Sequence, residues 1–132
     1  MHYLQNKDLL NSIGCFNPDN LSYSGFVITN AASYQKLADS LRLHLSNASC
    51  DTATMIAIDF TKYTLLGIKT TYGEGCTIDR SVIWDSDHTR ISYNIDIRQT
   101  GMRHGILFID LNYALIPRIP ANSTVVFHVT KE

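Results

Sequence analysis

The feature that most constrains this chain is a run of strictly alternating side chains between Thr89 and Gln99. Its apolar members are Ile91, Tyr93, Ile95 and Ile97, and its polar members are Ser92, Asn94, Asp96 and Arg98. Successive side chains of a strand point to opposite faces, so this pattern fits a strand with one buried and one solvated face. The polar members indicate a solvated sheet face, which is typical of antiparallel sheets.

Further segments rich in β-forming residues flank this run and predict a series of short strands. They are Phe26–Ile28, Met55–Ile58, Tyr63–Thr71, Thr77–Trp84, Ile106–Ile109, Leu111–Ile116 and Val125–Val129, of which Ile106–Ile109 and Leu111–Ile116 could form one bent strand. Turn-forming residues separate most of them, at 59–62, 73–75, 85–88 and 101–105. Because the connections are short, we expect neighbouring strands to pair antiparallel.

One helix stands out before the strands. Tyr34, Leu37, Ala38, Leu41 and Leu45 recur at helical spacing, and Asn30 precedes them as a good N-cap. The spacing predicts a helix from about Ala31 to Leu45. A shorter helix over residues 3–13 is also expected, with Gly14 as its end.

These elements together predict an α+β fold in a single domain over residues 1–132. Residues 1–23 form an N-terminal extension or short helix, and residues 54–129 form a β-rich block. We expect a curved, mostly antiparallel sheet, or a partial barrel or sandwich, with the 31–45 helix packed on it. Four residues receive structural roles: Asp59 in an Asx-type turn, Gly67 in the second strand of the block, and Pro117 and Pro120 in a turn.

Composition excludes several classes of function. The chain is 45% hydrophobic and 17% charged, with a net charge of −1, which is typical of a globular protein. Dispersed Lys and Arg residues offer no basic stripe, so we expect no nucleic-acid binding and no polybasic attraction to membranes. No apolar run reaches the roughly 18 residues of a membrane span. The first residues show no signal-peptide pattern, which leaves a cytoplasmic protein or an exported one with its signal removed.

The potential catalytic and metal-binding residues do not form a known motif. Cys15, Cys50 and Cys76 are an odd number, so at least one thiol is unpaired within the chain; a Cys15–Cys50 bridge would imply an oxidising compartment. Cys76 could act as a nucleophile with His88 or His104, although a structural role is favoured. The histidines are dispersed and the Asp85–His88 turn lacks the glycine and glutamate of a calcium loop, so we expect no metal and no cofactor.

Two sets of side chains remain as candidates for function. An acidic pair drawn from Asp79, Asp85, Asp87 and Asp96 could hydrolyse glycosides, although a solvated strand face is the favoured explanation of these residues. Tyr72, Trp84, Tyr93 and Tyr113 could form a recognition surface if they share a face, whereas core packing is the default for most of them.

The segment Ile58–Gly67 adds a resemblance to a family. It is similar to an I-D-F-S-K-Y-T-L-L-G segment of small secreted or lipid-anchored proteins of Bacteroidetes-type bacteria. Those proteins are similar in layout to the C-terminal domain of PrcB-type protease-complex subunits. Tyr93–Ile97 with Gly101 resembles the family's central strand and turn, and Asn112–Pro120 resembles its N-W-x-L-V-P-K-L-P element. Val125–Phe127 resembles its last strand, and Phe26–Ile28 fits as well.

The resemblance implies an exported, non-enzymatic accessory module in the periplasm or cell envelope, with another envelope protein as partner. The family often carries a cysteine in each of the loops 73–76 and 101–105, but only Cys76 is present here, so the implied bridge is missing. No catalytic residue carries over. The leading hypothesis is therefore a non-enzymatic extracytoplasmic binding module. The alternatives are a small hydrolase that uses Cys76 or an Asp pair, and a structural homo-oligomer whose exposed strand edge pairs with its copy.

Overall fold

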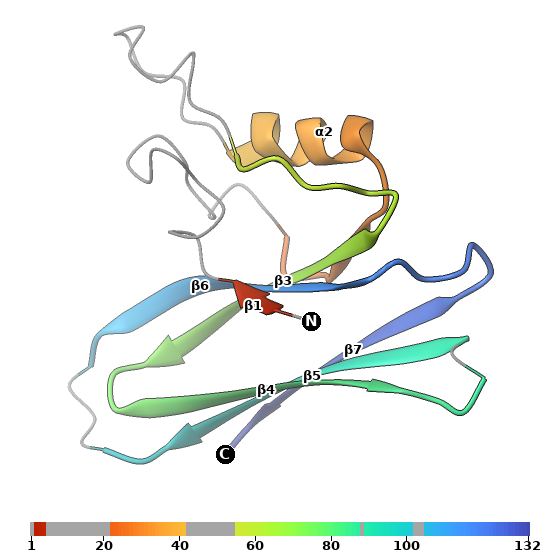
Figure 1. The fold of residues 1–132 in the computed structure, drawn as a ribbon. Coiled ribbons are helices and arrows are strands. Elements are labelled where there is room, and N and C mark those ends of the chain that lie inside the picture. The colour runs from red at the N-terminus through yellow and green to blue at the C-terminus, as the bar shows by residue number, and fades with distance from the viewer. Residues whose placement is uncertain (1, 5–21, 42–54, 88, 102–104) are drawn as a thin grey trace, which may run out of the picture. The chain divides into compact units, whose positions relative to one another are not determined.

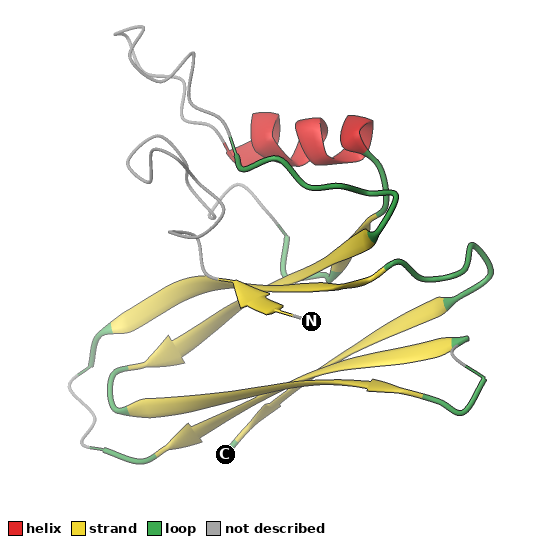
Figure 2. Cartoon of the chain, viewed as in Figure 1, coloured by secondary structure: helices red, strands yellow, loops and turns green. Residues whose placement is uncertain are grey.

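The computed structural model describes residues 2–4, 22–41, 55–87, 89–101 and 105–132. This part of the chain contains one helix and seven strands, and the strands form two sheets (Figures 1 and 2). The elements are β1 (His2–Leu4), β2 (Phe26–Ile28), α2 (Ala31–Leu41), β3 (Tyr63–Gly73), β4 (Cys76–Trp84), β5 (Arg90–Gln99), β6 (Leu107–Pro117) and β7 (Thr124–Lys131). The predicted α+β class with mostly antiparallel strands is confirmed.

The strand order is β1-β6-β3-β2 in one sheet and β4-β5-β7 in the other. β1 with β6, β2 with β3 and β4 with β5 pair antiparallel, whereas β5 and β7 pair in parallel. Our expectation that neighbours along the chain pair antiparallel is therefore correct for β4 and β5 but wrong for β3 and β4, which lie in different sheets. Gly75 in the turn between them has a φ of 83°, a backbone conformation that glycine adopts without strain.

The chain divides into two compact units, and β3 and β6 contribute residues to both. One unit consists of Met1–Lys69 and Leu111–Arg118, and the other of Thr70–Asp110 and Ile119–Glu132. That the whole chain is a single domain stays a prediction. No helix among the described residues is long and apolar enough to span a membrane.

Helix α2 supplies much of the core of the first unit. The Asn30 Oδ1 atom accepts a hydrogen bond of 2.8 Å from the Ser33 N–H, which caps the helix as predicted. The buried face of the helix consists of Tyr34, Leu37, Ala38 and Leu41, and its larger side chains cluster with Ile28, Leu65, Leu111 and Tyr113 from the strands. The predicted helix is confirmed over Ala31–Leu41, while residues 42–45 lie outside the described part.

Two local predictions are wrong in this unit. Tyr3 and Leu4 are not helical but belong to β1, where β6 supplies them with ladder partners that a short helix would lack; residues 5–13 lie outside the described part. In the predicted strand Met55–Ile58, only Met55 forms a bridge. The rest lies beside α2, where the Ile56 carbonyl accepts a side-chain hydrogen bond from Tyr34.

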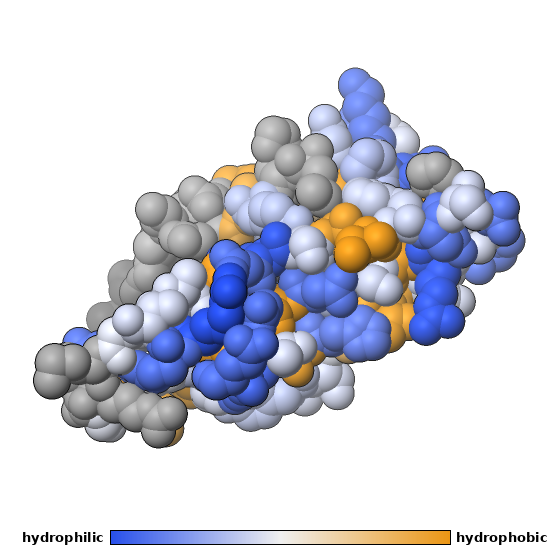
Figure 3. All heavy atoms as spheres, turned by 90° about the horizontal axis from the view of Figure 1, so that it is seen from below, coloured by the Kyte–Doolittle hydropathy of each residue, from blue (hydrophilic) through white to orange (hydrophobic). Residues whose placement is uncertain are grey.

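The alternating run between Thr89 and Gln99 forms β5 in the second unit. Its apolar members Ile91, Tyr93, Ile95 and Ile97 are at most 3% exposed. Exposure also alternates along β4, where Val82 is buried and Ile83 is exposed. Figure 3 shows one face of the molecule, on which hydrophilic residues surround smaller hydrophobic areas. The predicted segments Ile106–Ile109 and Leu111–Ile116 belong to the single strand β6, except for Ile106, which precedes it; the strand ends at Pro117, and Pro120 lies in the turn before β7.

Candidate functional site

The four predicted aromatic residues do not converge on one surface. Tyr93 and Tyr113 are fully buried and lie in different units. Tyr113 packs edge-on against Phe26 with ring centroids 6.3 Å apart, and Tyr93 packs likewise against Phe127 at 6.1 Å. These two rings thus have the core role that was the default.

Tyr72 and Trp84 are half-buried in the second unit. Tyr72 stacks on Phe108 with ring centroids 5.5 Å apart and an interplanar angle of 28°. Burial raises the pKa of the Tyr72 hydroxyl, and the nearby Asp110 charge adds to this effect. A role in binding stays a prediction for Tyr72 and Trp84.

Among the described residues, the hydrogen-bond partner of the Cys76 thiol is an amide group and not a base. The Cys76 Sγ atom donates to the Gln99 Oε1 atom at 3.3 Å. The Gln99 Nε2 atom in turn donates to the carbonyls of Glu74 (3.2 Å) and Gly101 (2.8 Å), which fixes the amide. An amide oxygen accepts the thiol hydrogen bond but does not remove the proton, so this contact does not activate a nucleophile. His88, His104, Cys15 and Cys50 lie outside the described residues.

Of the four candidate aspartates, Asp79 and Asp96 are opposite each other in the ladder of β4 and β5. Arg98 hydrogen-bonds Asp79, and its Nε atom lies 3.6 Å from the Asp96 Oδ2 atom. The hydrogen bond to Asp79, followed by the charges of Asp79 and Asp96, raises the pKa of the Arg98 guanidinium. Both carboxylates thus contact the same guanidinium group, so the structure gives them a shared role in holding Arg98.

The other two aspartates belong to the hairpin turn. The Asp85 carboxylate accepts hydrogen bonds from the Thr89 N–H at 2.9 Å and the Thr89 hydroxyl at 3.2 Å, and Asp87 is exposed. Across the described ranges, no group of three or more His, Cys, Asp or Glu side chains is placed to hold a metal ion.

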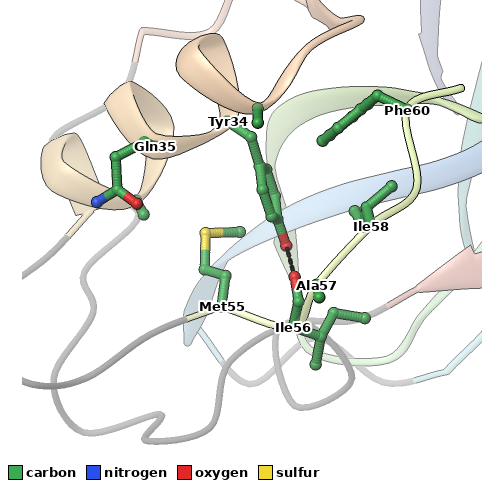
Figure 4. A pocket seen from close by; sticks show the side chains of 9 residues that line it. Tyr34, Gln35, Met55, Ile56, Ala57, Ile58 and Phe60 are labelled. Atoms are coloured by element: carbon green, nitrogen blue, oxygen red, sulfur yellow. Dashed lines mark hydrogen bonds between the residues drawn. The ribbon is translucent and has the colours of Figure 1, made fainter.

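An apolar pocket in the first unit is the best-formed candidate site (Figure 4). It lies between α2 and the segment Met55–Phe60 and has a volume of about 330 Å³. Its lining residues are Ala31, Tyr34, Gln35, Ala38, Met55, Ile56, Ala57, Ile58 and Phe60. Helical spacing puts the four α2 residues on one side. Ala31 and Ala38 leave the space open, because their side chains end at Cβ.

Tyr34 reaches across this pocket to its opposite wall. Its hydroxyl donates a hydrogen bond of 2.8 Å to the Ile56 carbonyl, which the dashed line in Figure 4 marks. The Tyr34 ring also packs edge-on against Phe60, with centroids 5.5 Å apart. Burial raises the pKa of the Tyr34 hydroxyl to about 12, so this side chain is a neutral and fixed part of the site.

The remaining lining is almost entirely apolar. Gln35 is its one other side chain with polar atoms, and its Nε2 atom donates to the Asp39 Oδ1 atom at 3.0 Å. The pocket is near the lower end of the roughly 300–1,000 Å³ range of ligand sites. It therefore suits a small apolar group and offers no charge to a polar substrate.

The sequence analysis did not identify this pocket. Its helix wall was visible as a stripe, but Met55–Ile58 was interpreted as a sheet strand. The signal that could have indicated an open space is the small side chain of Ala38 among the larger buried residues of the helix. Among known proteins, no family model, no curated protein and no solved structure matches the chain.

Proposed function

We propose that the protein is a non-enzymatic binding module that acts outside the cytoplasm and takes an apolar side chain of an envelope protein into the pocket between α2 and Met55–Phe60. The pocket itself carries the proposal. It has an apolar lining and a volume of about 330 Å³. The hydroxyl of Tyr34, which reaches across it, is already hydrogen-bonded to the Ile56 carbonyl. Such a site binds by burial of apolar surface.

The mouth of the pocket offers surface that a protein partner could cover. Ile56 is 41% exposed although it lines the pocket, and Ala57 beside it is exposed as well. Fully burying a side chain of this size stabilises a complex by about 1.5–3 kcal/mol. A partner side chain that enters the pocket would also cover Ile56. One contact would therefore bury apolar surface of both the partner and this protein.

The contacts of the candidate catalytic groups support the proposal that the protein is not an enzyme. Cys76 donates to an amide oxygen, and Asp79 and Asp96 share the cation of Arg98. Both arrangements serve the structure of the second unit. A hydrolase is the less favoured alternative for this reason.

The proposed location outside the cytoplasm rests on the resemblance of Ile58–Gly67 to exported proteins. That segment starts at the pocket: Ile58 and Phe60 line it. Between them the Asp59 carboxylate accepts a hydrogen bond of 3.0 Å from the Thr61 N–H and starts the turn into β3. Fractionation of cells that express the native gene should place the protein with the envelope, and recovery in the cytoplasm alone would refute this part.

The binding proposal is tested by capture from native envelope extract with matched variants. Ile56→Asp puts a charge at the pocket mouth, and Ile83→Asp puts the same charge at a position in the other unit that is 57% exposed. We expect wild type and Ile83→Asp to retain the same partner at physiological salt, and Ile56→Asp to lose at least tenfold of it. Equal capture by all three proteins, or capture by none, would refute the proposal.

A further inference from the structure

A second surface is independent of the pocket. Four consecutive apolar side chains are exposed where β6 begins: Ile106 (51%), which precedes the strand, and Leu107 (76%), Phe108 (41%) and Ile109 (41%), which open it. Since neighbouring side chains of a strand point to opposite faces, both faces of this segment reach solvent. Single exposed apolar residues are ordinary, but a continuous exposed run marks an interaction site.

The backbone of the same segment has an open edge. The Ile106 carbonyl accepts a hydrogen bond of 3.1 Å from the Glu74 N–H, at the end of β3. In an antiparallel ladder, hydrogen-bonding direction alternates along the strand, so the backbone groups of Leu107 and Ile109 point to the opposite edge. β1 is the neighbour of β6 on that edge, and it pairs only with residues 113–115. Within the described chain no strand covers the edge at Leu107 and Ile109.

The described residues along this edge also lack the charges and prolines that usually protect against pairing. Natural edges carry charged residues, prolines or bulges, whereas 105–109 contains no charge and no proline. The next residue, Asp110, is held by Arg80 of β4, with its Oδ2 atom 3.6 Å from the Arg80 Nη2 atom. The backbone edge of this segment can therefore pair with an uncharged strand.

We infer that the protein forms a twofold dimer in which 106–110 pairs antiparallel with the same segment of a second copy. With Phe108 at the twofold axis, Leu107 of one copy lies opposite Ile109 of the other, and their outward backbone groups meet. The two Phe108 rings then form a directly opposed pair of the closely spaced, non-hydrogen-bonded kind. Tyr72 already stacks on Phe108, so the pairing would join four rings.

A second copy fits this edge better than a charged peptide. The edge offers apolar side chains and open backbone groups but no ion pair, so its partner must itself be an apolar β-forming segment. This chain contains one, namely 106–109. A contact limited to one short strand segment per copy is smaller than the roughly 800 Å² per partner of a standard interface. The dimer should therefore be reversible and concentration-dependent.

Sedimentation equilibrium of the full chain tests the surface. Leu107→Lys should make the protein monomeric, because it places a charge at the most exposed of the four positions. Ile83→Lys, at the exposed position on β4, should leave the dimer unchanged. Wild type that stays monomeric up to about 1 mM, the weak limit of specific association, would overturn the inference. So would a Leu107→Lys protein that dimerises like wild type.

Disulfide trapping tests the pairing itself. Phe108→Cys should form an intermolecular bridge under mild oxidation, because the two Cβ atoms face each other at the axis. Leu107→Cys should crosslink no more than wild type, whose own cysteines set the background, because its partner position is 109. Equal crosslinking of both variants would overturn this register. Ile56→Asp should dimerise normally, so failure of the pocket proposal and failure of the dimer are distinguishable.

Discussion

At the scale of single residues, Tyr34 connects the fold with the proposed site. It belongs to the buried stripe of α2, and its hydroxyl crosses the pocket to the Ile56 carbonyl. The hydrogen bond contributes about 1 kcal/mol at neutral pH. It also holds the Met55–Phe60 segment, most of which is irregular, against the helix. One side chain therefore sets the shape of the apolar space.

Replacing this residue, Tyr34→Phe, should alter how stability depends on alkaline pH. The folded pKa of Tyr34 is raised from 10.0 to about 12, so the unfolded chain releases this proton first. Wild type should lose stability as pH rises from about 10 to about 12, whereas the variant lacks this contribution. Urea unfolding under reducing conditions at pH 8 and pH 11 measures it. The difference between the two proteins should shrink at pH 11, and a constant difference would contradict the account.

Residue identity alone predicted part of this arrangement. The apolar spacing placed Tyr34 on the buried face, and Asn30 and Asp59 were recognised as cap and turn because their side chains bond to neighbouring backbone. The partner of the Tyr34 hydroxyl lies 22 residues away. Contacts of that range depend on how the chain folds back, and helical periodicity contains no information about them.

At the scale of elements, β3 is the strand on which the first unit is assembled. β2 and β6 flank it, and Gly67 lies opposite Phe26 of β2 in the ladder. A Cβ atom at Gly67 would overlap the Phe26 ring. That ring also packs against Tyr113 of β6, so it has little freedom to move. The glycine allows an aromatic ring to lie on the strand.

Gly67→Ala should consequently destabilise the protein by about 1–3 kcal/mol, the usual cost of overpacking. Gly73→Ala in the same strand is the matched control, because the nearest atom to its added Cβ lies 4.0 Å away. The comparison is made by urea denaturation of both variants. Trimming the ring with Phe26→Leu should recover much of the loss in the double variant. A Gly67→Ala protein as stable as Gly73→Ala would show that the ring does not constrain this position.

Strand existence was more predictable than strand pairing. Alternation marked β5 correctly, since the exposure of each position follows directly from side-chain direction. The parallel partner of β5 is β7, although β6 lies between them in sequence and belongs to the other sheet. Neither turn residues nor alternation predict the pairing of β7 with β5, because this pairing is a contact between segments far apart in the sequence. Local patterns also made His2–Leu4 hard to assign, as β1 exists only through its pairing with β6.

At the scale of the whole molecule, two compact units carry two separate surfaces. The first unit holds the apolar pocket between α2 and Met55–Phe60, and the second holds the open edge of β6 at Leu107 and Ile109. The pocket is proposed for an envelope partner and the edge for a second copy. A reversible dimer would present two pockets to the same partner assembly, which raises the apparent affinity without any new contact.

The central claim is that the pocket binds a partner, and methyl NMR tests it most directly. Protein labelled at methionine and isoleucine methyl groups reports on Met55, Ile56 and Ile58 in the pocket, with Ile83 and the buried Ile91 of the second unit as internal controls. On addition of native envelope extract, we predict that the signals of Met55, Ile56 and Ile58 shift or broaden, while those of Ile83 and Ile91 stay unchanged. Unchanged pocket signals, or a response at Ile83 alone, would contradict the account.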